Sequence, residues 1–364
     1  MDVLIGTLSL LVILALFSLF TFKAPYGSKA MNALAGAAVA SFLIEALIGS
    51  VLGDMLGIAV FQEIGNLAGS LSGIAAGTLV AMALKVQPGY ALMISLPLAN
   101  MGILPGFIAG YFASFLVKWL QDRVPNGINL IAIVFIATPL TYFIAALIAP
   151  PVNGILLNVG SILESAQSQS AIVMGIIIGG VLTVTSTAPL SSMALTAIMG
   201  LTGQPMAIAA MAIFGSGFLN YTFFRKMGLT TPQETISVAI EALTKAHVIA
   251  ANPIPVYVTN FIYGGIAGVV IALSGLVNDS PGTAAVVPGF ASTFAWNPPV
   301  QVLLYGLIVA VLGVTVGWIC SFIFKNYPIK TEEELLTRDD EELEEKNEEA
   351  RVKESNLKPE SMNA

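Results

Sequence analysis

The stretch that decides the fold reads, from Ala171 to Leu201, AIVMGIIIGGVLTVTSTAPLSSMALTAIMGL. It begins as an apolar run, is interrupted by the small polar residues and the proline of 183–192, and then becomes apolar again. Lipid offers no hydrogen-bond partners to an unravelled backbone, so such a break must be buried in protein or line a wet cavity. Transporters bind substrates at broken helices of this kind. The stretch therefore predicts a broken membrane segment that contributes to a binding site.

The composition of the whole chain is typical of a membrane protein. Its 364 residues are 56% hydrophobic and 10% charged, whereas charged residues make up about 25% of a soluble domain. The chain has one cysteine, Cys320, and one histidine, His247, so we expect neither an internal disulfide nor a metal site. No phosphate-binding or dinucleotide-binding glycine motif is present. No basic patch suggests nucleic acid. We therefore expect no cofactor and no nucleic-acid partner.

Nine apolar stretches are candidates for membrane segments, because a spanning helix needs about 20 apolar residues. They are 3–22, 31–60, 67–84, 90–117, 130–149, 171–201, 206–224, 253–277 and 300–324. Three of these, 31–60, 90–117 and 171–201, are too long or too interrupted for one simple crossing. We predict an all-α polytopic protein with eight to ten transmembrane or re-entrant helices. The less apolar stretch 150–170 is interpreted as an interfacial amphipathic helix.

The charges gather at the C-terminus. Residues 331–364 hold 13 acidic and 5 basic residues, a net charge of −8, whereas the rest of the chain has 9 acidic and 10 basic residues. We divide the chain into a membrane domain, 1–325, and an acidic tail, 326–364, that is helical or disordered and has no apolar stripe to pack. The positive-inside rule places this tail in the cytoplasm.

Glycines recur at intervals of four in several stretches, for example Gly175 and Gly179. Small residues at this spacing let helices approach closely in lipid. Tight bundle packing is one interpretation. A sliding surface for a moving domain is the other.

A further helix is predicted at 232–251. Thr231 and Glu234 have the spacing of a capping box, and the sequence Asn252-Pro253 predicts the helix end. This helix either lies at the membrane interface or is re-entrant. In the second case its end would meet the polar break at 183–192.

The polar break supplies most of the candidate substrate-binding residues. Each hydroxyl can donate and accept a hydrogen bond, which suits a neutral sugar or polyol better than an ion. The alternative is that these side chains bond back to the carbonyls of a broken helix. The candidates in this group are Thr183, Thr185, Ser186, Thr187, Ser191 and Ser192, with Asn220 from the next span.

Four other residues complete the candidate set. Glu45 lies in a long apolar stretch, where it could bind a coupling ion or a sugar hydroxyl, or cap a helix break. Glu241 has the favourable spacing for an ion pair with Lys245, so it is either a solvated partner or a ligand of the solute. His247 is either a satisfied polar residue or a proton relay, and Asn252 marks the helix end.

The order of these motifs resembles the membrane (IIC) subunits of the sugar phosphotransferase system, especially the fructose-like branch. The resemblance rests on the glycine-rich helix 174–189, on Val124-Pro-Asn-Gly-Ile128, and on 242–253. It covers most of residues 30–325. The closest likeness is to the IIC-like group that includes regulators of a clostridial pore-forming toxin.

The chain departs from the family pattern at both motifs. Thr-Ser-Thr-Ala-Pro189 stands where the family has an acidic motif before Gly-Gly-Pro. The family glutamate falls on Leu243, two positions from Glu241, and the aspartate of the family's Asp-Pro is Asn252. These differences argue against recognition of a fructose-type sugar.

The resemblance implies a sugar permease in the bacterial plasma membrane that works as a homodimer and uses separate soluble IIA and IIB proteins for any phosphorylation. This chain has no catalytic residues of its own and would at most be the membrane subunit of a sugar phosphotransferase. Two alternatives stay open. One is a membrane-bound regulator or sensor that keeps the permease fold, and the other is an ion-coupled secondary transporter.

Overall fold

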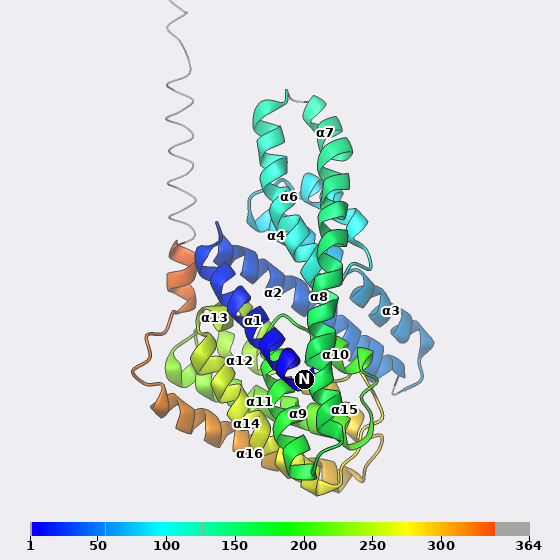
Figure 1. The fold of residues 1–364 in the computed structure, drawn as a ribbon, viewed down its shortest axis with the longest axis vertical. Coiled ribbons are helices and arrows are strands. Elements are labelled where there is room, and N and C mark those ends of the chain that lie inside the picture. The colour runs from blue at the N-terminus through cyan, green and yellow to red at the C-terminus, as the bar shows by residue number, and fades with distance from the viewer. Residues whose placement is uncertain (1, 55, 126, 339–364) are drawn as a thin grey trace, which may run out of the picture.

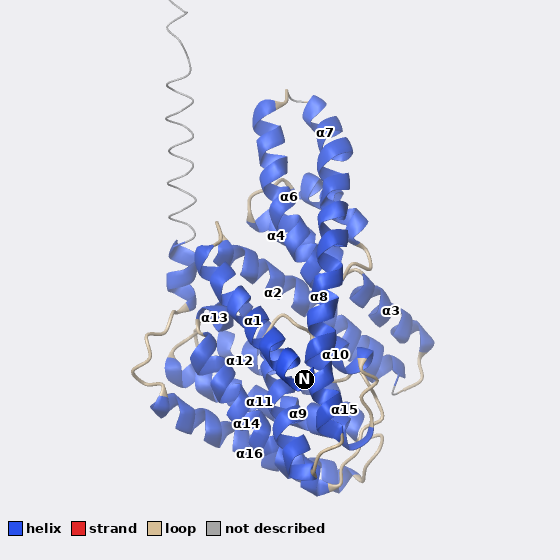
Figure 2. Cartoon of the chain, viewed as in Figure 1, coloured by secondary structure: helices blue, strands red, loops and turns tan. Residues whose placement is uncertain are grey.

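The computed structural model describes residues 2–54, 56–125 and 127–338. Within these residues the regular elements are all helices (Figure 2). The N-terminal elements are α1 (Asp2–Lys23), α2 (Gly27–Leu43), η1 (Ile44–Asp54), α3 (Ala59–Ser70), α4 (Ser72–Ala83), α5 (Pro88–Ser95), η2 (Leu96–Leu98), α6 (Ile103–Arg123), α7 (Ile128–Ala132), η3 (Ile133–Ala137) and α8 (Thr138–Gln167). The C-terminal elements are α9 (Ala171–Thr187), α10 (Ser192–Ile198), α11 (Gly203–Met227), α12 (Glu234–Ile240), η4 (Ala242–Lys245), α13 (Ala246–Ala251), α14 (Pro253–Ser274), α15 (Val286–Thr293) and α16 (Pro299–Ile323).

Seven helical stretches in the described residues are long and apolar enough to cross a membrane. Helices α3 and α4 meet at a bend of 48° and together would make an eighth span. Two shorter apolar helices, 88–98 and α9, add further segments. The prediction of an all-α polytopic membrane protein is therefore confirmed.

The helices pack in two groups (Figure 1). In the first group, α4 packs on α2 and α6, α6 packs on α8, and α1 packs along α8. In the second group, α14 packs along α9, and α11 packs against α14, α15 and α16. The two groups meet where α2 and α1 touch the segment η4–α13, where α8 touches α9 and α10, and where η1 touches α15. In Figure 1 the end of α6 and α7, which continues into α8, project from one end of the molecule, and α9 to α16 lie at the other end together with α1.

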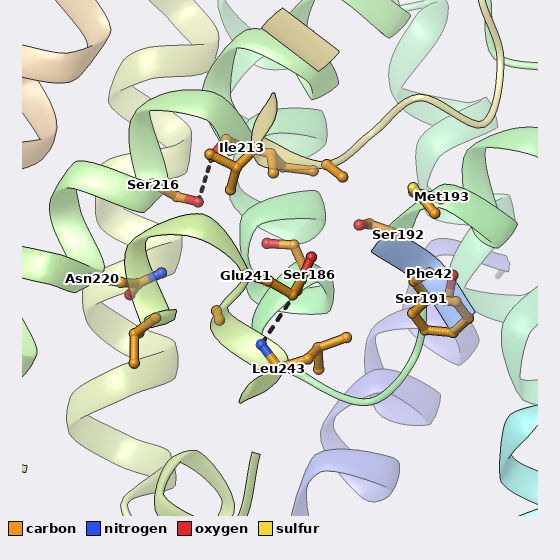
Figure 3. Close-up of a pocket in the computed structure, with 14 residues that line it drawn as sticks. Phe42, Ser186, Ser191, Ser192, Met193, Ile213, Ser216, Asn220, Glu241 and Leu243 are labelled. Carbon is orange, nitrogen blue, oxygen red and sulfur yellow. Dashed lines mark hydrogen bonds between the residues drawn. The ribbon is translucent and has the colours of Figure 1, made fainter. Parts of the chain in front are cut away.

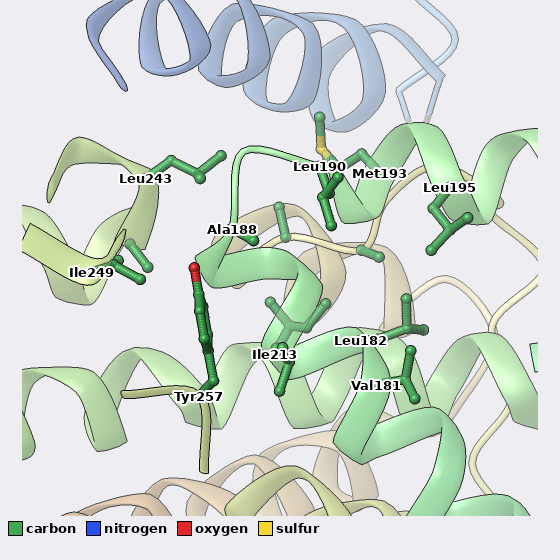
Figure 4. Packing of buried hydrophobic residues seen from close by; sticks show 14 of the residues in the cluster. Val181, Leu182, Ala188, Leu190, Met193, Leu195, Ile213, Leu243, Ile249 and Tyr257 are labelled. Atoms are coloured by element: carbon green, nitrogen blue, oxygen red, sulfur yellow. The ribbon is translucent and has the colours of Figure 1, made fainter. Parts of the chain in front are cut away.

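The two broken segments of the second group share one apolar core (Figure 4). Ala188 and Leu190, from the turn after α9, are buried beside Leu243 of η4. Tyr257 of α14 lies below them, with Ile249 of α13 nearby. Packing of these side chains fixes the position of each break relative to the other.

Glycine spacing lets α9 and α14 approach at backbone distance. A Cβ atom at Gly264 would collide with the Gly179 carbonyl oxygen, and one at Gly268 would collide with that of Gly175. The tight-packing interpretation of the glycine spacing is therefore correct for this helix pair.

The predicted interfacial helix at 150–170 is wrong in its boundaries. Helix α8 runs without interruption from Thr138 to Gln167 and contains Pro150 and Pro151. Proline is tolerated within membrane helices because neighbouring groups and local adjustments satisfy the carbonyls that it leaves free. The prolines therefore do not end this helix.

The single helix predicted at 232–251 is also wrong. Its capping box forms, since the Thr231 N–H donates to Glu234 Oε2 and the Glu234 N–H donates to Thr231 Oγ1. The helix then ends at Ile240, and Glu241 is extended (φ −151°, ψ 106°). The chain continues as η4 and α13, so the segment is a broken hairpin between α11 and α14. The four-residue ion pair of Glu241 with Lys245 does not form, because Lys245 pairs elsewhere.

The expectation that the tail has no packing face is wrong for its first residues. Residues 332–338 are helical, and Leu335 is only 2% exposed. Arg338 donates to the Thr21 carbonyl oxygen at 3.0 Å. The remainder of the predicted tail, 339–364, lies outside the described residues.

Candidate functional site

The first wall of the site is the break between α9 and α10. Helix α9 ends at Thr187, and Pro189 prevents its continuation because proline has no N–H to donate. Ser191 adopts a left-handed conformation (φ 49°), which is uncommon for a residue other than glycine. Its hydroxyl accepts a hydrogen bond from the Ala194 N–H at 3.1 Å and so caps α10. The break is thus a defined turn.

The three threonines of the break donate hydrogen bonds to carbonyl oxygens near the end of α9. Thr183 donates to the Gly179 carbonyl oxygen at 2.9 Å, and Thr185 and Thr187 each donate to a carbonyl oxygen three residues earlier. The Thr183 hydroxyl also lies 2.8 Å from the Asn260 carbonyl oxygen and so contacts α14. All three side chains are buried. They stabilise the broken helix rather than face a cavity, as the alternative interpretation of the polar break describes.

The second wall is the break at Glu241. One carboxylate oxygen of Glu241 accepts a hydrogen bond from the Leu243 N–H at 3.3 Å. The Thr244 hydroxyl donates to the Glu241 carbonyl oxygen at 2.9 Å. The first of these bonds caps the start of η4, where the Leu243 N–H has no acceptor within the helix. The two bonds leave the other carboxylate oxygen of Glu241 available.

The two breaks converge on one narrow cavity (Figure 3). Its polar lining comes from four serines, one amide and one carboxylate: Ser186, Ser191, Ser192, Ser216, Asn220 and Glu241. Its apolar lining includes Phe42, Met193, Ile213, Val238 and Leu243. The cavity measures about 20 Å³, which is room for a water molecule. The site is therefore closed in this conformation.

Asn220 has an amide nitrogen without a partner. Its oxygen accepts a hydrogen bond from Asn260 at 2.9 Å. Its nitrogen is buried and makes no hydrogen bond. A buried donor without a partner is unusual in a folded protein, and here it belongs to a residue that lines the cavity.

A second and larger cavity of about 250 Å³ lies beside the first. It is lined by residues of the first helix group, among them Glu45, Ser72 and Asn153, and by residues of the turn after α9. Phe42 and Ser191 line both cavities, so they form the partition between them. The structure places Glu45 in this second cavity, where Ser191 is the one other candidate residue, and not in the first.

His247 and Asn252 lie in a separate polar cluster that the C-terminal segment completes. Glu332 Oε1 is 2.6 Å from Lys245 Nζ and 3.2 Å from His247 Nε2. Asn252 Nδ2 donates to the Lys330 carbonyl oxygen at 2.7 Å, and the Lys330 N–H donates to Asn252 Oδ1 at 2.8 Å. The side chain of Asn252 is therefore committed to holding the C-terminal segment.

Lys245 bridges two carboxylates in this cluster, because its Nζ is also 2.8 Å from Glu234 Oε1. Hydrogen bonds from Lys245 and Thr231 lower the pKa of Glu234 to about 2. Burial opposes ionisation of Glu332, but its close contact with His247 and its hydrogen bond from Lys245 outweigh burial and lower the pKa of this carboxyl. Both glutamates are therefore ionised at neutral pH.

The structure thus brings together five of the eleven candidate residues in one cavity: Ser186, Ser191, Ser192, Asn220 and Glu241. Sequence reasoning missed Ser216, although it precedes Asn220 by one helical turn and therefore shares its face of α11. It also missed Phe42, which no local pattern distinguishes from other apolar residues. Among the described residues no three His, Cys, Asp or Glu side chains form a group that could hold a metal ion.

Comparison with known protein families shows to which family this chain belongs. The family model of the phosphotransferase system EIIC subunits matches residues 28–336. The chain belongs to the EIIC family. It is therefore a multi-pass membrane protein of the type that phosphotransferase systems use as sugar permeases, with IIA and IIB proteins as the partners that such systems imply. A search of curated proteins finds no significant match.

Proposed function

We propose that this EIIC protein binds a neutral sugar or polyol in the cavity between the breaks at Ser191 and Glu241. One observation carries the proposal: two broken segments, about 50 residues apart in the sequence, place hydroxyls, an amide and a carboxylate around one closed cavity. Broken helices that meet inside a membrane protein are typical of transporter substrate sites.

The groups around the cavity match the chemistry of such a ligand. Burial raises the pKa of Glu241 to about 7. Its ionised form accepts hydrogen bonds from ligand hydroxyls, its protonated form can also donate one, and the Asn220 amide nitrogen donates to them. The serine hydroxyls can donate a hydrogen bond to a ligand hydroxyl or accept one from it. Apolar side chains such as Phe42 and Ile213 cover the carbon-bound hydrogens. No lysine or arginine lines the cavity, so the site favours a neutral ligand over an anion.

Binding requires the cavity to open, because about 20 Å³ cannot hold a sugar. The neighbouring cavity of about 250 Å³ supplies a route, with Phe42 and Ser191 as the partition that must move. Phe42 belongs to the first helix group and Ser191 to the second. An elevator-like movement of the second group against the first would separate them and give alternating access.

Several finer features of the proposal follow from family membership. Separate IIA and IIB proteins would phosphorylate the solute. The permease would work as a homodimer in a bacterial plasma membrane, with its C-terminal tail in the cytoplasm. We also propose that the protein is related to the fructose-like branch and to the group that includes toxin regulators. The missing acidic motif at 185–188 nevertheless argues for a solute other than a fructose-type hexose.

An uptake assay tests the proposal. The protein is reconstituted into sealed vesicles and offered radiolabelled sugars and polyols, with and without cytosolic phosphotransferase proteins. We expect saturable uptake of at least one solute and its loss, by tenfold or more, in E241Q. The matched control is E164Q, because Glu164 is exposed on α8 and lines neither cavity. Absence of saturable uptake for every solute would contradict the proposal.

A regulatory role is a second candidate, and one observation favours it. The C-terminal segment contacts the hairpin that carries Glu241, through Glu332 and Lys245. A change at the site could therefore alter how the segment is held and so reach the cytoplasmic tail.

A further inference from the structure

The orientation of the Asn220 amide is set by a residue that does not line the cavity. Asn260 is fully buried in α14, and its Nδ2 donates to the Val256 carbonyl oxygen at 3.0 Å. A backbone carbonyl oxygen can only accept a hydrogen bond. The group of Asn260 that faces Val256 must therefore be its NH₂.

The same nitrogen of Asn260 lies 2.9 Å from Asn220 Oδ1 and donates to it. If Asn220 were turned over, two NH₂ groups would face each other and neither could accept. Asn220 must therefore direct its oxygen toward Asn260 and its nitrogen away from it. That nitrogen is buried and has no partner in the described part of the chain. Figure 3 shows it on the side of Asn220 that faces Ser216 and Glu241.

We infer that Asn260 is a positioning residue for the binding site: it fixes Asn220 as a hydrogen-bond donor toward the ligand. The inference rests on the proposed function. The cavity then has a polarity, with a donor at the Asn220 end and a carboxylate acceptor at the Glu241 end. Asn220 recognises the ligand hydroxyl beside it as a hydrogen-bond acceptor. The ionised form of Glu241 recognises the hydroxyl beside it as a donor.

Fluorine distinguishes the two roles, because a carbon-bound fluorine can accept weakly but cannot donate. The experiment uses the full-length protein in lipid nanodiscs. Binding is measured for D-glucose, D-fructose, D-mannitol and N-acetyl-D-glucosamine, and then for the monodeoxy and monofluoro analogues of whichever binds. At one carbon of that ligand we expect the fluoro analogue to bind about twofold more tightly than the deoxy analogue, the lower end of what one neutral hydrogen bond supplies, because fluorine accepts only weakly.

Two variants test whether this preference for the fluoro analogue depends on Asn220 and on its contact with Asn260. N260L removes the amide at similar size and frees Asn220 to rotate, so the preference for fluoro over deoxy at that carbon should fall to about onefold. N220L should remove it at the same carbon. The matched control is Y263F, because Tyr263 is buried one turn further along α14 and donates to the Val309 carbonyl oxygen, away from the cavity. Y263F should keep the wild-type preference even where it lowers stability.

The outcomes separate the inference from the proposed function. If the parent sugar binds and N260L keeps the wild-type analogue profile, the positioning role is wrong while the binding site stands. If no sugar binds to the wild type, both fall. Should N260L not fold, the wild-type profile decides alone, since equal losses for deoxy and fluoro analogues at every carbon would contradict a fixed donor.

Discussion

Two residues that stand between helices shape the site. Ser191 is left-handed and Glu241 is extended, and each stands where a helix stops and another begins. In both cases the side chain accepts a hydrogen bond from a nearby backbone N–H. The same residues line the cavity. Each of the two side chains thus caps the helix that follows it and presents an oxygen to the ligand.

Substitution of Ser191 should separate its cap from its conformation. S191A loses the cap and keeps the left-handed strain, so we expect the free energy of unfolding to fall by about 1 kcal/mol. S191G also loses the cap, but glycine relieves strain worth about 1 kcal/mol, so its stability should stay near that of the wild type. Thermal melting of the purified variants measures the difference. Equal melting temperatures for S191A and S191G would contradict this account.

One of the two helix breaks can be predicted from the local sequence and the other cannot. The break at 188–191 is visible in the sequence because Pro189 and its polar neighbours oppose a helix locally. The break at Glu241 is not visible, because a capping box at Thr231 and the spacing of Glu241 and Lys245 both favour one continuous helix. Contacts distant in sequence override that preference.

At the scale of elements, the hairpin α12–η4–α13 is held by the C-terminal segment. Lys245 would favour a partner four residues away, but it lies between Glu234 and Glu332 instead. The second partner is 87 residues away in sequence. No local pattern reports such a contact, which is why the sequence suggested a tail without a packing face.

The cluster around Lys245 should make stability depend on pH. Because the folded-state pKa values of Glu234 and Glu332 are lowered, their ionised forms stabilise the fold fully above about pH 4.5. This contribution is lost as the pH falls toward 2. The groups that face these carboxylates are Lys245 and, for Glu332, His247. Glu241 acts in the opposite direction, because burial raises its pKa to about 7 and its protonated form stabilises the fold on acidification. The contribution of the cluster is therefore the part of the pH dependence between pH 6 and pH 3 that is lost when its two carboxylates are removed.

The double variant E234Q/E332Q should melt at a lower temperature than the wild type at pH 6, and this difference should shrink as the pH falls to 3. E333Q is the matched control, because Glu333 is exposed and neighbours Glu332. A double variant with the wild-type pH profile would show that the cluster does not contribute. Intrinsic tryptophan fluorescence reports the transition.

The crossing of α9 and α14 gives a second prediction at this scale. G264A places a methyl group against the Gly179 backbone and the Thr183 hydroxyl, so the helices must separate and the melting temperature should fall by several degrees. G265A is the matched control on the same helix, because its methyl group would meet nothing closer than 3.6 Å. In G265A the higher helix propensity of alanine should leave stability unchanged or raise it by up to about 1 kcal/mol. Similar losses in both variants would contradict close packing as the cause.

At the scale of the whole molecule, the cavity lies where the two helix groups meet. Most of its lining comes from α9 to α15, and Phe42 is the contribution of the first group. The C-terminal segment joins the groups on the far side of the hairpin, since Arg338 contacts Thr21 of α1 and Glu332 contacts Lys245 of η4. A relative movement of the groups therefore has to strain or release this segment.

Two truncations should separate the roles of the C-terminal region. Deletion of 339–364 keeps Glu332 and Leu335, so a permease should retain its melting temperature and its uptake, whereas a regulator that signals through the tail should lose its output. Deletion of 331–364 removes Glu332 and leaves His247 without its carboxylate neighbour and Lys245 with Glu234 alone. Removing one partner of a buried ion pair is strongly destabilising, so this longer deletion should lower the melting temperature in either case. Uptake that survives the shorter deletion and fails only with the longer one would show that the segment 331–338, and not the acidic tail, belongs to the transport machinery.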